Sequence, residues 1–241
     1  MKLLIGALSL LMLGGCATNG QTPWAVLSGS SSCSKPSAEQ ELALNLADDM
    51  ANEGKLHASL ANLQSLPDAL PQVRLRKARA ARLLGRSEAE PMYRSLVGTC
   101  LAAEGEHGLG QLASARGNND QALAHMQRAA QLAPTNEKIR NDLGVVYLDQ
   151  LRLEEARFEF LTAMELKQSD QLAAVNMVTL LIYQDNWGQA AQLVSQLSLS
   201  PEQVNNAQVR AQRLKASSKA VARKPKDQVA AVSDALPATV K

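Results

Sequence analysis

The clearest hydrophobic pattern in this chain is the apolar face of one helix near the C-terminus. Val204, Ala207, Ala211 and Leu214 recur at intervals of three and four positions, which places their side chains on one side of an α-helix. The segment just before them, Ser200-Pro201-Glu202-Gln203, combines a capping box with a proline at the first helical position. Alternating Val, Ile and Thr runs bounded by turn residues, which would predict strands, are absent. The pattern predicts an all-α protein.

Regularly placed turn residues divide the chain into helix pairs. The capping box Ser37-x-x-Gln40 begins the first helix. Gly54, Gly85 and Gly117 follow at nearly equal intervals, and glycine suits the left-handed conformation that ends a helix. The last two pairs are expected to turn at Leu151-Arg152 and Asp185-Asn186. The predicted pairs are 37–67, 70–99, 102–134, 136–168 and 170–198, with a final helix at 200–216 that covers the last core face.

Two stretches of the chain align with each other at a constant offset. The matching positions are Gly110 with Gly144, Ala122 with Ala156, Met126 with Phe160, and Ala129 with Ala163. Small residues at such positions let two antiparallel helices approach closely, and large residues fill the groove between them. The offset equals the length of a tetratricopeptide repeat (TPR), and the second copy resembles its pattern Leu-Gly-x-x-Tyr followed by Ala-x-x-x-Phe, whereas the first has Ala113 in place of the tyrosine. The resemblance implies a TPR solenoid with two degenerate, TPR-like pairs at its start, a fold that binds other proteins.

The N-terminus carries the pattern of an export signal. Two residues, Met1-Lys2, precede an apolar run at 3–13, which is too short to span a bilayer but suits a secretory signal. The run ends in Leu13-Gly14-Gly15-Cys16, which resembles the lipobox of bacterial lipoproteins. That resemblance implies lipidation of Cys16, and Ala17 after it implies the outer membrane, facing the periplasm. The alternative is an ordinary signal peptide in which Cys16 is incidental.

Composition and charge complete the predicted domain organisation. Hydrophobic residues make up 46% of the chain but aromatic residues only 3%, as expected of closely packed helices. From residue 207 onward, eight basic residues face two acidic ones, which gives this end a net charge of +6 and leaves −4 for the rest. The basic end favours an acidic partner or a membrane surface. The predicted divisions are a signal peptide at 1–15, a flexible tether at 16–36, the solenoid at 37–216 and a disordered basic tail at 217–241.

The sequence offers no recognisable catalytic, metal-binding or cofactor motif. His57, His107 and His125 are dispersed, without the spacing of metal ligands. Glu104 and Glu106 beside His107 fit the solvated start of a helix. A glycine-rich phosphate loop and a Gly-x-Ser-x-Gly nucleophile elbow are both absent from the sequence. An enzyme is therefore not predicted, and the scarcity of aromatic residues disfavours nucleic acid as a partner.

Two cysteines remain beside Cys16. Cys33 and Cys100 would lie in an oxidising compartment if the chain is exported, and an even number of thiols there favours a bridge. The alternative is two unpaired thiols, one of them buried in a helix pair.

Basic residues concentrate in the second predicted pair. Arg79, Arg82 and Arg86 are spaced so that they share one face of a continuous helix. In a TPR register this face lines the concave groove and would attract a carboxylate-bearing segment, whereas the alternative is a solvated convex face. The groove positions predicted in the later pairs are His107, Gln111, Ser114, Asn141, Val145, Leu148, Val175, Thr179, Ile182 and Tyr183. Such a surface suits an extended or helical peptide.

TPR motifs follow the lipobox in three places: Asn141-Asp142-Leu143-Gly144-Val145 before Tyr147, Glu154-Glu155-Ala156 to Leu161, and Ala174-Val175-Asn176-Met177-Val178 before Leu180. This combination resembles the TPR lipoproteins of the Tad (tight adherence, Flp) pilus assembly system, the TadD-like family. The likeness covers 100–198 well and 37–99 loosely. It implies a non-enzymatic, outer-membrane-anchored scaffold that assists assembly of a pilus component or its secretin. A type IV pilus pilotin and a periplasmic adaptor that recruits cell-wall enzymes are the alternatives.

Overall fold

Eleven helices account for the fold over the residues that the computed structural model describes, which are 33–169 and 171–233, with side chains as far as Lys219. All of them belong to the unit of the chain that begins at Cys33. No strand occurs in these ranges, so the predicted all-α class is confirmed. The helices are α1 (Ala38–Asn52), α2 (Leu56–Gln64), α3 (Pro71–Leu83), α4 (Ala89–Arg94), α5 (Ala102–Ala115), α6 (Asn119–Leu132), α7 (Glu137–Asp149), α8 (Leu153–Leu166), α9 (Leu172–Tyr183), α10 (Trp187–Gln196) and α11 (Pro201–Ser233).

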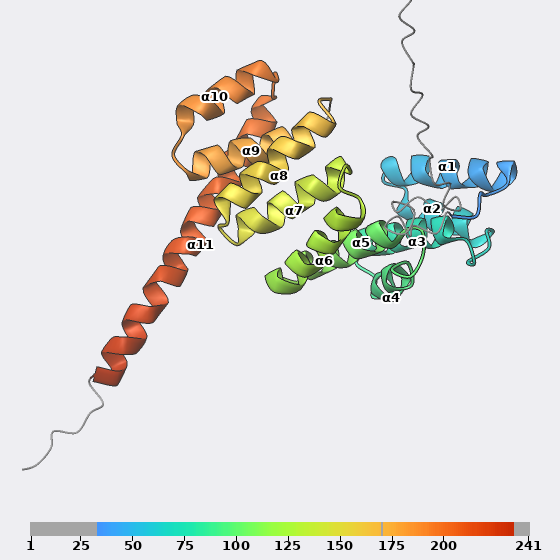
Figure 1. Cartoon of the computed structure of the whole chain (residues 1–241), viewed down its shortest axis with the longest axis horizontal. Coiled ribbons are helices and arrows are strands. Elements are labelled where there is room, and N and C mark those ends of the chain that lie inside the picture. The colour runs from blue at the N-terminus through green and yellow to red at the C-terminus, as the bar shows by residue number, and fades with distance from the viewer. Residues whose placement is uncertain (1–32, 170, 234–241) are drawn as a thin grey trace, which may run out of the picture. The chain divides into compact units, whose positions relative to one another are not determined.

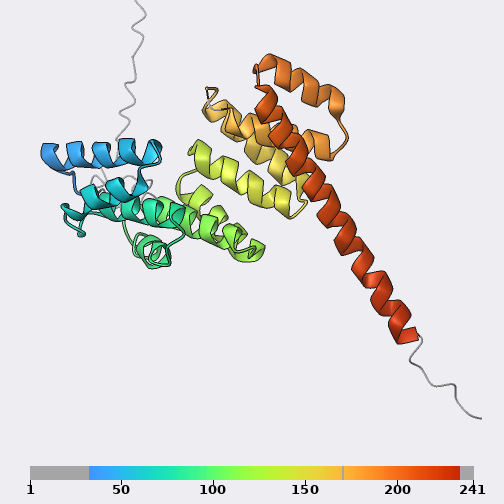
Figure 2. The ribbon, with the colours of Figure 1, turned by 180° about the vertical axis from the view of Figure 1, so that it is seen from behind.

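The helices pack as five successive pairs followed by a single helix. Helices α1 and α2, α3 and α4, α5 and α6, α7 and α8, and α9 and α10 form the pairs, and each pair also contacts the next (Figure 1). Helix α11 packs on α9, the first helix of the fifth pair (Figure 2). The expected solenoid of about five pairs with a final covering helix is therefore present.

The predicted turns adopt the backbone conformation that their residues suggested. Gly54, Gly85 and Gly117 have φ values of 78°, 68° and 73°. Leu151 and Asp185 take the equivalent place in the next two pairs, both with φ of 59°, a conformation that costs a residue with a Cβ atom more than it costs glycine. The same tight left-handed turn therefore closes the first helix of all five pairs.

The hydrophobic core runs along the pairs as three buried clusters. The first joins α1, α2 and α3 around Leu63 and Val73, and the second joins α3, α4 and α5 around Tyr93 and Leu96. The third extends from α5 to α11 and includes the fully buried Phe160. A core of this kind needs an element to cover its last face, and Ala207, Ala211 and Leu214 of α11 do so.

Glycines in the first helices allow the closest contacts of the core. A Cβ atom on Gly144 would lie 2.6 Å from the Phe160 ring, and one on Gly108 would lie 2.1 Å from the Tyr93 ring. One on Gly110 would lie 3.0 Å from the flexible Met126 side chain. Gly144 with Phe160 and Gly110 with Met126 are the matches noted in the sequence, and both correspond to direct packing between the two helices of a pair, whereas Gly108 meets Tyr93 of the preceding pair.

The C-terminal end differs from the prediction. We expected disorder from residue 217 onward, but α11 continues to Ser233. Residues 217–233 include four alanines and three lysines, which have high helix propensity, so a helix nucleated on the packed part of α11 can continue into this segment although Pro225 disfavours a helix interior.

The N-terminal predictions fall mostly outside the described residues. The signal peptide at 1–15, Cys16 and most of the tether lie there, as does the end of the tail at 234–241. Cys33 is described, and a disulfide joins it to Cys100 with their Cα atoms 5.2 Å apart. The Gln72 amide also donates to the Ser34 carbonyl at 3.0 Å. The start of the described chain is thus fixed to the second helix pair. No helix in the described ranges is long and apolar enough to cross a membrane.

The contact between Gly144 and Phe160 gives the first testable prediction. Gly144→Ala should lower the free energy of unfolding by about 1–3 kcal/mol, because the new methyl group overlaps a fully buried ring. Gly188→Ala is the matched control, since a Cβ atom there meets nothing within 4 Å and alanine favours a helix. Chemical denaturation followed by circular dichroism measures both variants. Equal stability of Gly144→Ala and the unmodified chain would contradict the proposed packing.

Candidate binding surface

Equivalent positions on the first helices of the last three pairs and on α11 carry four polar side chains. These are His107 on α5, Asn141 on α7, Asn176 on α9 and Arg210 on α11, and each follows the one before it by about one repeat length. Because these helices lie next to one another, the repeat places the four side chains in a row. We call this row, together with the residues that bond to it, the polar ladder.

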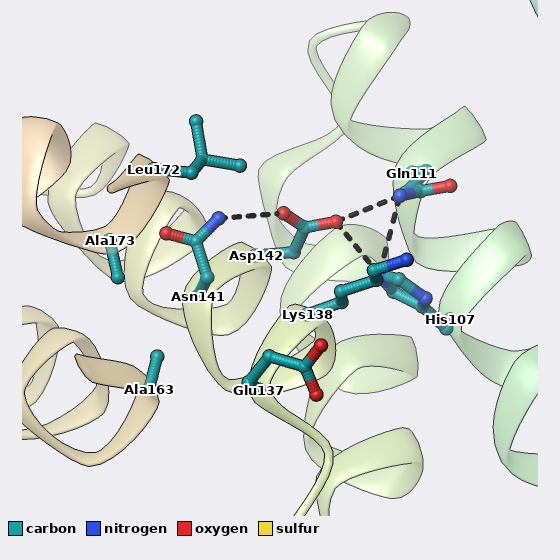
Figure 3. A pocket seen from close by; sticks show the side chains of 9 residues that line it. All are labelled: His107, Gln111, Glu137, Lys138, Asn141, Asp142, Ala163, Leu172 and Ala173. Carbon is teal, nitrogen blue, oxygen red and sulfur yellow. Dashed lines mark hydrogen bonds and ion pairs between the residues drawn. The ribbon is translucent and has the colours of Figure 1, made fainter. Parts of the chain in front are cut away.

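Asp142 is the junction at one end of the polar ladder. One of its carboxylate oxygens lies 2.7 Å from His107 Nε2 and accepts a hydrogen bond from the Gln111 amide at 2.8 Å. The other oxygen accepts from the Asn141 amide at 3.1 Å. Figure 3 shows Asp142 between Asn141 on one side and His107 with Gln111 on the other. The carboxylate therefore joins α5 to α7.

The contacts of Asp142 also determine its charge. Burial by itself raises the pKa of the carboxyl, but the hydrogen bonds and the charge of His107, with the amides of Gln111 and Asn141, outweigh it. The pKa of Asp142 consequently lies below its ordinary value. Asp142 is an anion at neutral pH, held by donors from two helices.

The ladder continues through the two buried asparagines to the last helix. The Asn176 amide donates to the Asn141 side-chain oxygen at 2.8 Å. The Arg210 guanidinium donates to the Asn176 side-chain oxygen at 2.9 Å and to Asp149 at 3.0 Å. His107, Gln111 and Asn141, which the sequence predicted as groove contacts, thus bond within the molecule, and the ladder links α5, α7, α9 and α11.

A second set of polar contacts joins the two helices within a pair. Glu106, on α5, lies 2.6 Å from His125, on α6, and Arg140, on α7, lies 3.1 Å from Glu159, on α8. The two contacts occupy equivalent positions in successive repeats, with acid and base exchanged. Burial raises the pKa of Glu159 despite its contact with Arg140. Glu106 also forms an ion pair with Arg128 at 3.1 Å, so both buried acids have a cationic partner inside their own helix pair.

Two neighbouring cavities open beside the ladder. The first has a volume of about 240 Å³ and contains the small apolar side chains Ala163 and Ala173, with Leu172 at its edge (Figure 3). The second has a volume of about 570 Å³ and reaches from α1 and α3 to α7. Both are lined by His107, Gln111, Glu137 and Lys138, so they form one continuous groove. The groove is apolar at one end and charged at the other.

Basic side chains give the second cavity its charge. Arg76 is neutralised by Asp48 at 2.7 Å, whereas Arg82 has only a 3.4 Å contact with the Tyr93 hydroxyl. The side chains of Arg79 and Lys138 are exposed and make no hydrogen bond or ion pair with any described residue. The groove therefore presents cations that its own residues do not neutralise.

Arg86 does not share the face of Arg79 and Arg82, contrary to our expectation. Helix α3 ends at Leu83, and Gly85 turns the chain with a positive φ, so helical spacing does not extend to Arg86. Arg86 instead lies 3.4 Å from His57 and lines a separate cavity with Arg74 and Lys77. The basic residues of this segment thus divide between two surfaces.

Other predicted groove residues also lie elsewhere. Leu148 and Thr179 are 0% and 1% exposed, so both belong to the core, and the Thr179 hydroxyl donates to the Val175 carbonyl at 3.0 Å. The connection before α9 is one residue longer than in the regular repeat. Our assignment assumed the regular length, so each groove position that it gave on α9 is one residue too early. Of the other predicted groove residues, Val145, Val175 and Tyr183 are partly buried and pack on the core. Ile182 is buried within the core, and Ser114 is half-buried and lies outside both cavities.

The residues that our sequence reasoning missed are Asp142, Lys138, Asn176 and Arg210. The recurrence of polar residues at 141, 176 and 210 was a readable signal, but it required one interval to be a position longer than the regular repeat. Lys138 had no periodic signal, because it reaches the groove from the first turn of α7. Within 33–169 and 171–233, no group of three or more His, Cys, Asp or Glu residues is arranged to hold a metal ion.

Comparison with known proteins agrees with this architecture. Residues 113–174 match the tetratricopeptide repeat. The chain is also 42% identical over 213 residues to the TPR repeat-containing protein PA4299 of Pseudomonas aeruginosa, covering 88% of this chain and 85% of that protein. The chain belongs to the tetratricopeptide-repeat family, whose members typically act as scaffolds that bind proteins or peptides.

Solved structures of low sequence identity share the fold. The PilF protein of Pseudomonas aeruginosa superimposes with a TM-score of 0.56 at 17% identity, over 76% of this chain and 86% of that one. The TPR protein TTC0263 of Thermus thermophilus gives 0.55 at 19% identity, over 73% and 98%. These likenesses support the solenoid architecture alone.

The network around Asp142 gives a prediction about pH. Asp142→Asn should lower the free energy of unfolding at neutral pH by about 1–3 kcal/mol, because one donor loses its acceptor. Since the folded-state pKa of Asp142 is depressed, its contribution is present above the ordinary pKa of aspartate and is lost as pH falls through the folded-state value. The stability difference between the two proteins should therefore shrink on acidification.

Denaturant titrations between neutral pH and about pH 3 measure this difference. Glu165→Gln is the control, because Glu165 is exposed and lies outside the ladder. A difference that is constant over the whole range would show that Asp142 is not the stabilising anion described above.

Proposed function

We propose that this chain is an outer-membrane-anchored TPR scaffold that assists assembly of a Tad (Flp) pilus or its secretin by binding a segment of a component protein. The groove beside the polar ladder is the binding surface. The protein performs no chemistry in this role: the lipid supplies the location, and the groove supplies the partner.

The continuous groove with unneutralised cations is the observation that carries the proposal. A rigid row of first helices, spaced by side-chain hydrogen bonds, offers a preformed concave surface. A preformed surface loses little conformational entropy when it binds an extended segment. The two cavities in this surface differ in polarity, which allows a segment to be bound in one direction and one register.

The location rests on the N-terminal sequence. The motif Leu13-Gly14-Gly15-Cys16 and the apolar run before it support export and lipidation at Cys16. Multiple acyl chains would anchor the protein stably in a membrane. The TadD-like motifs in 100–198 support the pilus system, and the likeness in fold to PilF, a pilus protein by its name, is consistent with it.

Two other scaffold roles use the same groove. A type IV pilus pilotin would bind a different secretin, and a periplasmic adaptor would bind cell-wall synthases or hydrolases. The partner captured in the cell distinguishes these roles from the one proposed.

A photo-crosslinking residue in the groove identifies the partner. Leu83 is suitable, because it lines the larger cavity and is 55% exposed. Gln131 on α6, exposed and outside both cavities, is the matched control position. We expect crosslinking at position 83, and not at 131, to a Tad secretin or another Tad pilus component. Capture of cell-wall enzymes at position 83 would support the adaptor and contradict the proposal.

The proposed anchor gives a prediction of its own. Cys16→Ser should leave the protein as an unprocessed precursor or as a species absent from the outer membrane, because sulfur lipidation precedes signal cleavage in this class of proteins. Fractionation of cells and the mass of the mature N-terminus measure the outcome. The adjacent substitution Ala17→Ser retains the cysteine and should leave the protein membrane-bound. Normal outer-membrane localisation of Cys16→Ser would exclude the lipoprotein assignment.

A further inference from the structure

The groove contains an unequal distribution of charge that specifies the chemistry of its occupant. Arg79 lies on α3 and Lys138 at the start of α7, yet both line the same 570 Å³ cavity. Neither side chain has a partner among the described residues, and Arg82 has only one long hydrogen bond. Three cations from two helix pairs are thus available to one ligand.

The acids of this cavity do not neutralise those cations. Asp48 is occupied by Arg76 at 2.7 Å, and Glu137 lies 3.4 Å from Lys167. Glu104 is the remaining acidic side chain in the lining. A ligand that entered here would therefore meet an excess of positive charge, which favours carboxylates.

The smaller cavity selects for a different group. Ala163, Ala173 and Leu172 supply its apolar part, while Asn141 and Asp142 beside them are already bonded within the polar ladder. Apart from Lys138, which lines both cavities, the polar side chains of this cavity already have partners within the described chain, so a polar side chain beside Ala163 and Ala173 would find few free partners. An apolar side chain bound there would remove its own apolar surface and that of the cavity from water, which is favourable.

We infer that the groove binds an extended acidic segment of a partner protein, with carboxylates at Arg79, Arg82 and Lys138 and one apolar side chain in the cavity at Ala163, Leu172 and Ala173. This inference deepens the proposed function and rests on it for the biological source of the segment. The cations are spread over α3 and α7, so they suit several side-chain carboxylates along a segment better than one terminal carboxylate. The apolar anchor then sets the register.

An unbiased peptide selection tests the chemistry without knowledge of the partner. A phage-displayed library of random peptides is selected against the full chain in detergent and, in parallel, against an Arg79→Glu/Lys138→Glu variant. We expect the full chain to enrich peptides that combine several Asp or Glu residues with a large apolar residue, and the variant to lose them. Enrichment of basic or uncharged peptides, or no enrichment, would overturn the inference.

Binding of the enriched peptide, labelled with a fluorophore, then tests each end of the groove. Arg79→Glu and Lys138→Glu should each weaken binding by about tenfold or more, because attraction becomes repulsion. Arg213→Glu is the matched control, with the same change of charge at an exposed residue of α11 outside both cavities, and should change affinity by less than about twofold. An equal effect of all three substitutions would indicate general attraction by net charge and would overturn the groove assignment.

A double-mutant cycle tests the apolar anchor. Leu172→Ser should weaken the enriched peptide but should have little further effect on the same peptide with its apolar residue replaced by serine. Additive effects would show that this residue does not bind at Leu172. Circular dichroism of every variant verifies that the helices are intact.

The two proposals can fail separately. If crosslinking at position 83 captures a Tad component but Arg79→Glu binds it normally, the proposed function holds and the acidic-segment inference is wrong. If acidic peptides bind as described but crosslinking captures cell-wall enzymes, the inference about chemistry holds and the proposed function is wrong.

Discussion

The close contact between the two helices of a pair, which glycine allows at α5–α6 and α7–α8, is the constraint on which the rest of this structure depends. Phe160 is fully buried against Gly144, and Met126 packs against Gly110 one repeat earlier. Without a side chain on the glycine, the two backbones approach closely enough to exclude water from the large residue between them. Each pair then offers a similar surface to the next, and the pairs stack in a regular row. The groove exists because this stacking repeats.

Polar contacts give the stacked helices their spacing and determine which charges stay available. Hydrogen bonds from His107 to Arg210 run across three first helices and α11, and each buried amide in this row finds a partner. Ion pairs with Arg128 and Arg140, inside the helix pairs, neutralise Glu106 and Glu159. The groove cations Arg79 and Lys138 remain outside both networks. A frame held by internal hydrogen bonds, with a few cations outside them, is the basis of the acidic-segment binding that we propose, because a preformed surface has little to order when a ligand arrives.

The first two pairs differ from the later ones, and this difference matters for the surface. Helix α4 is short, and the segment that follows it carries Cys100, which is bonded to Cys33. The disulfide holds the N-terminal segment against the same pair that supplies Arg79 and Arg82. Covalent fixation there limits local opening of the pair that has the smallest second helix. The helix pair that supplies the charged end of the groove is thereby held by a covalent link to the N-terminal segment.

Local signals in the sequence determined the helices, their pairing and their turns. Gly54, Gly85 and Gly117 have the backbone conformation that their positions suggested, because the preference of glycine for a positive φ does not depend on distant contacts. The repeat likewise predicted which small and large residues meet. The capping box at Ser37 forms as expected, with hydrogen bonds of 2.9 and 3.2 Å to Gln40.

Only the tertiary structure decided which side chains reach the groove. One extra position before α9 turns the helix assignment by about 100°, so Thr179 lies in the core although a strict repeat placed it on the surface. Arg86 does not lie on the face of Arg79, because α3 ends before it. Lys138 lines the same cavity as Arg79, although the two residues are far apart in the sequence. Such outcomes depend on where helices end and how they rotate against their neighbours, and these are properties of the packed molecule that no single stretch of sequence contains.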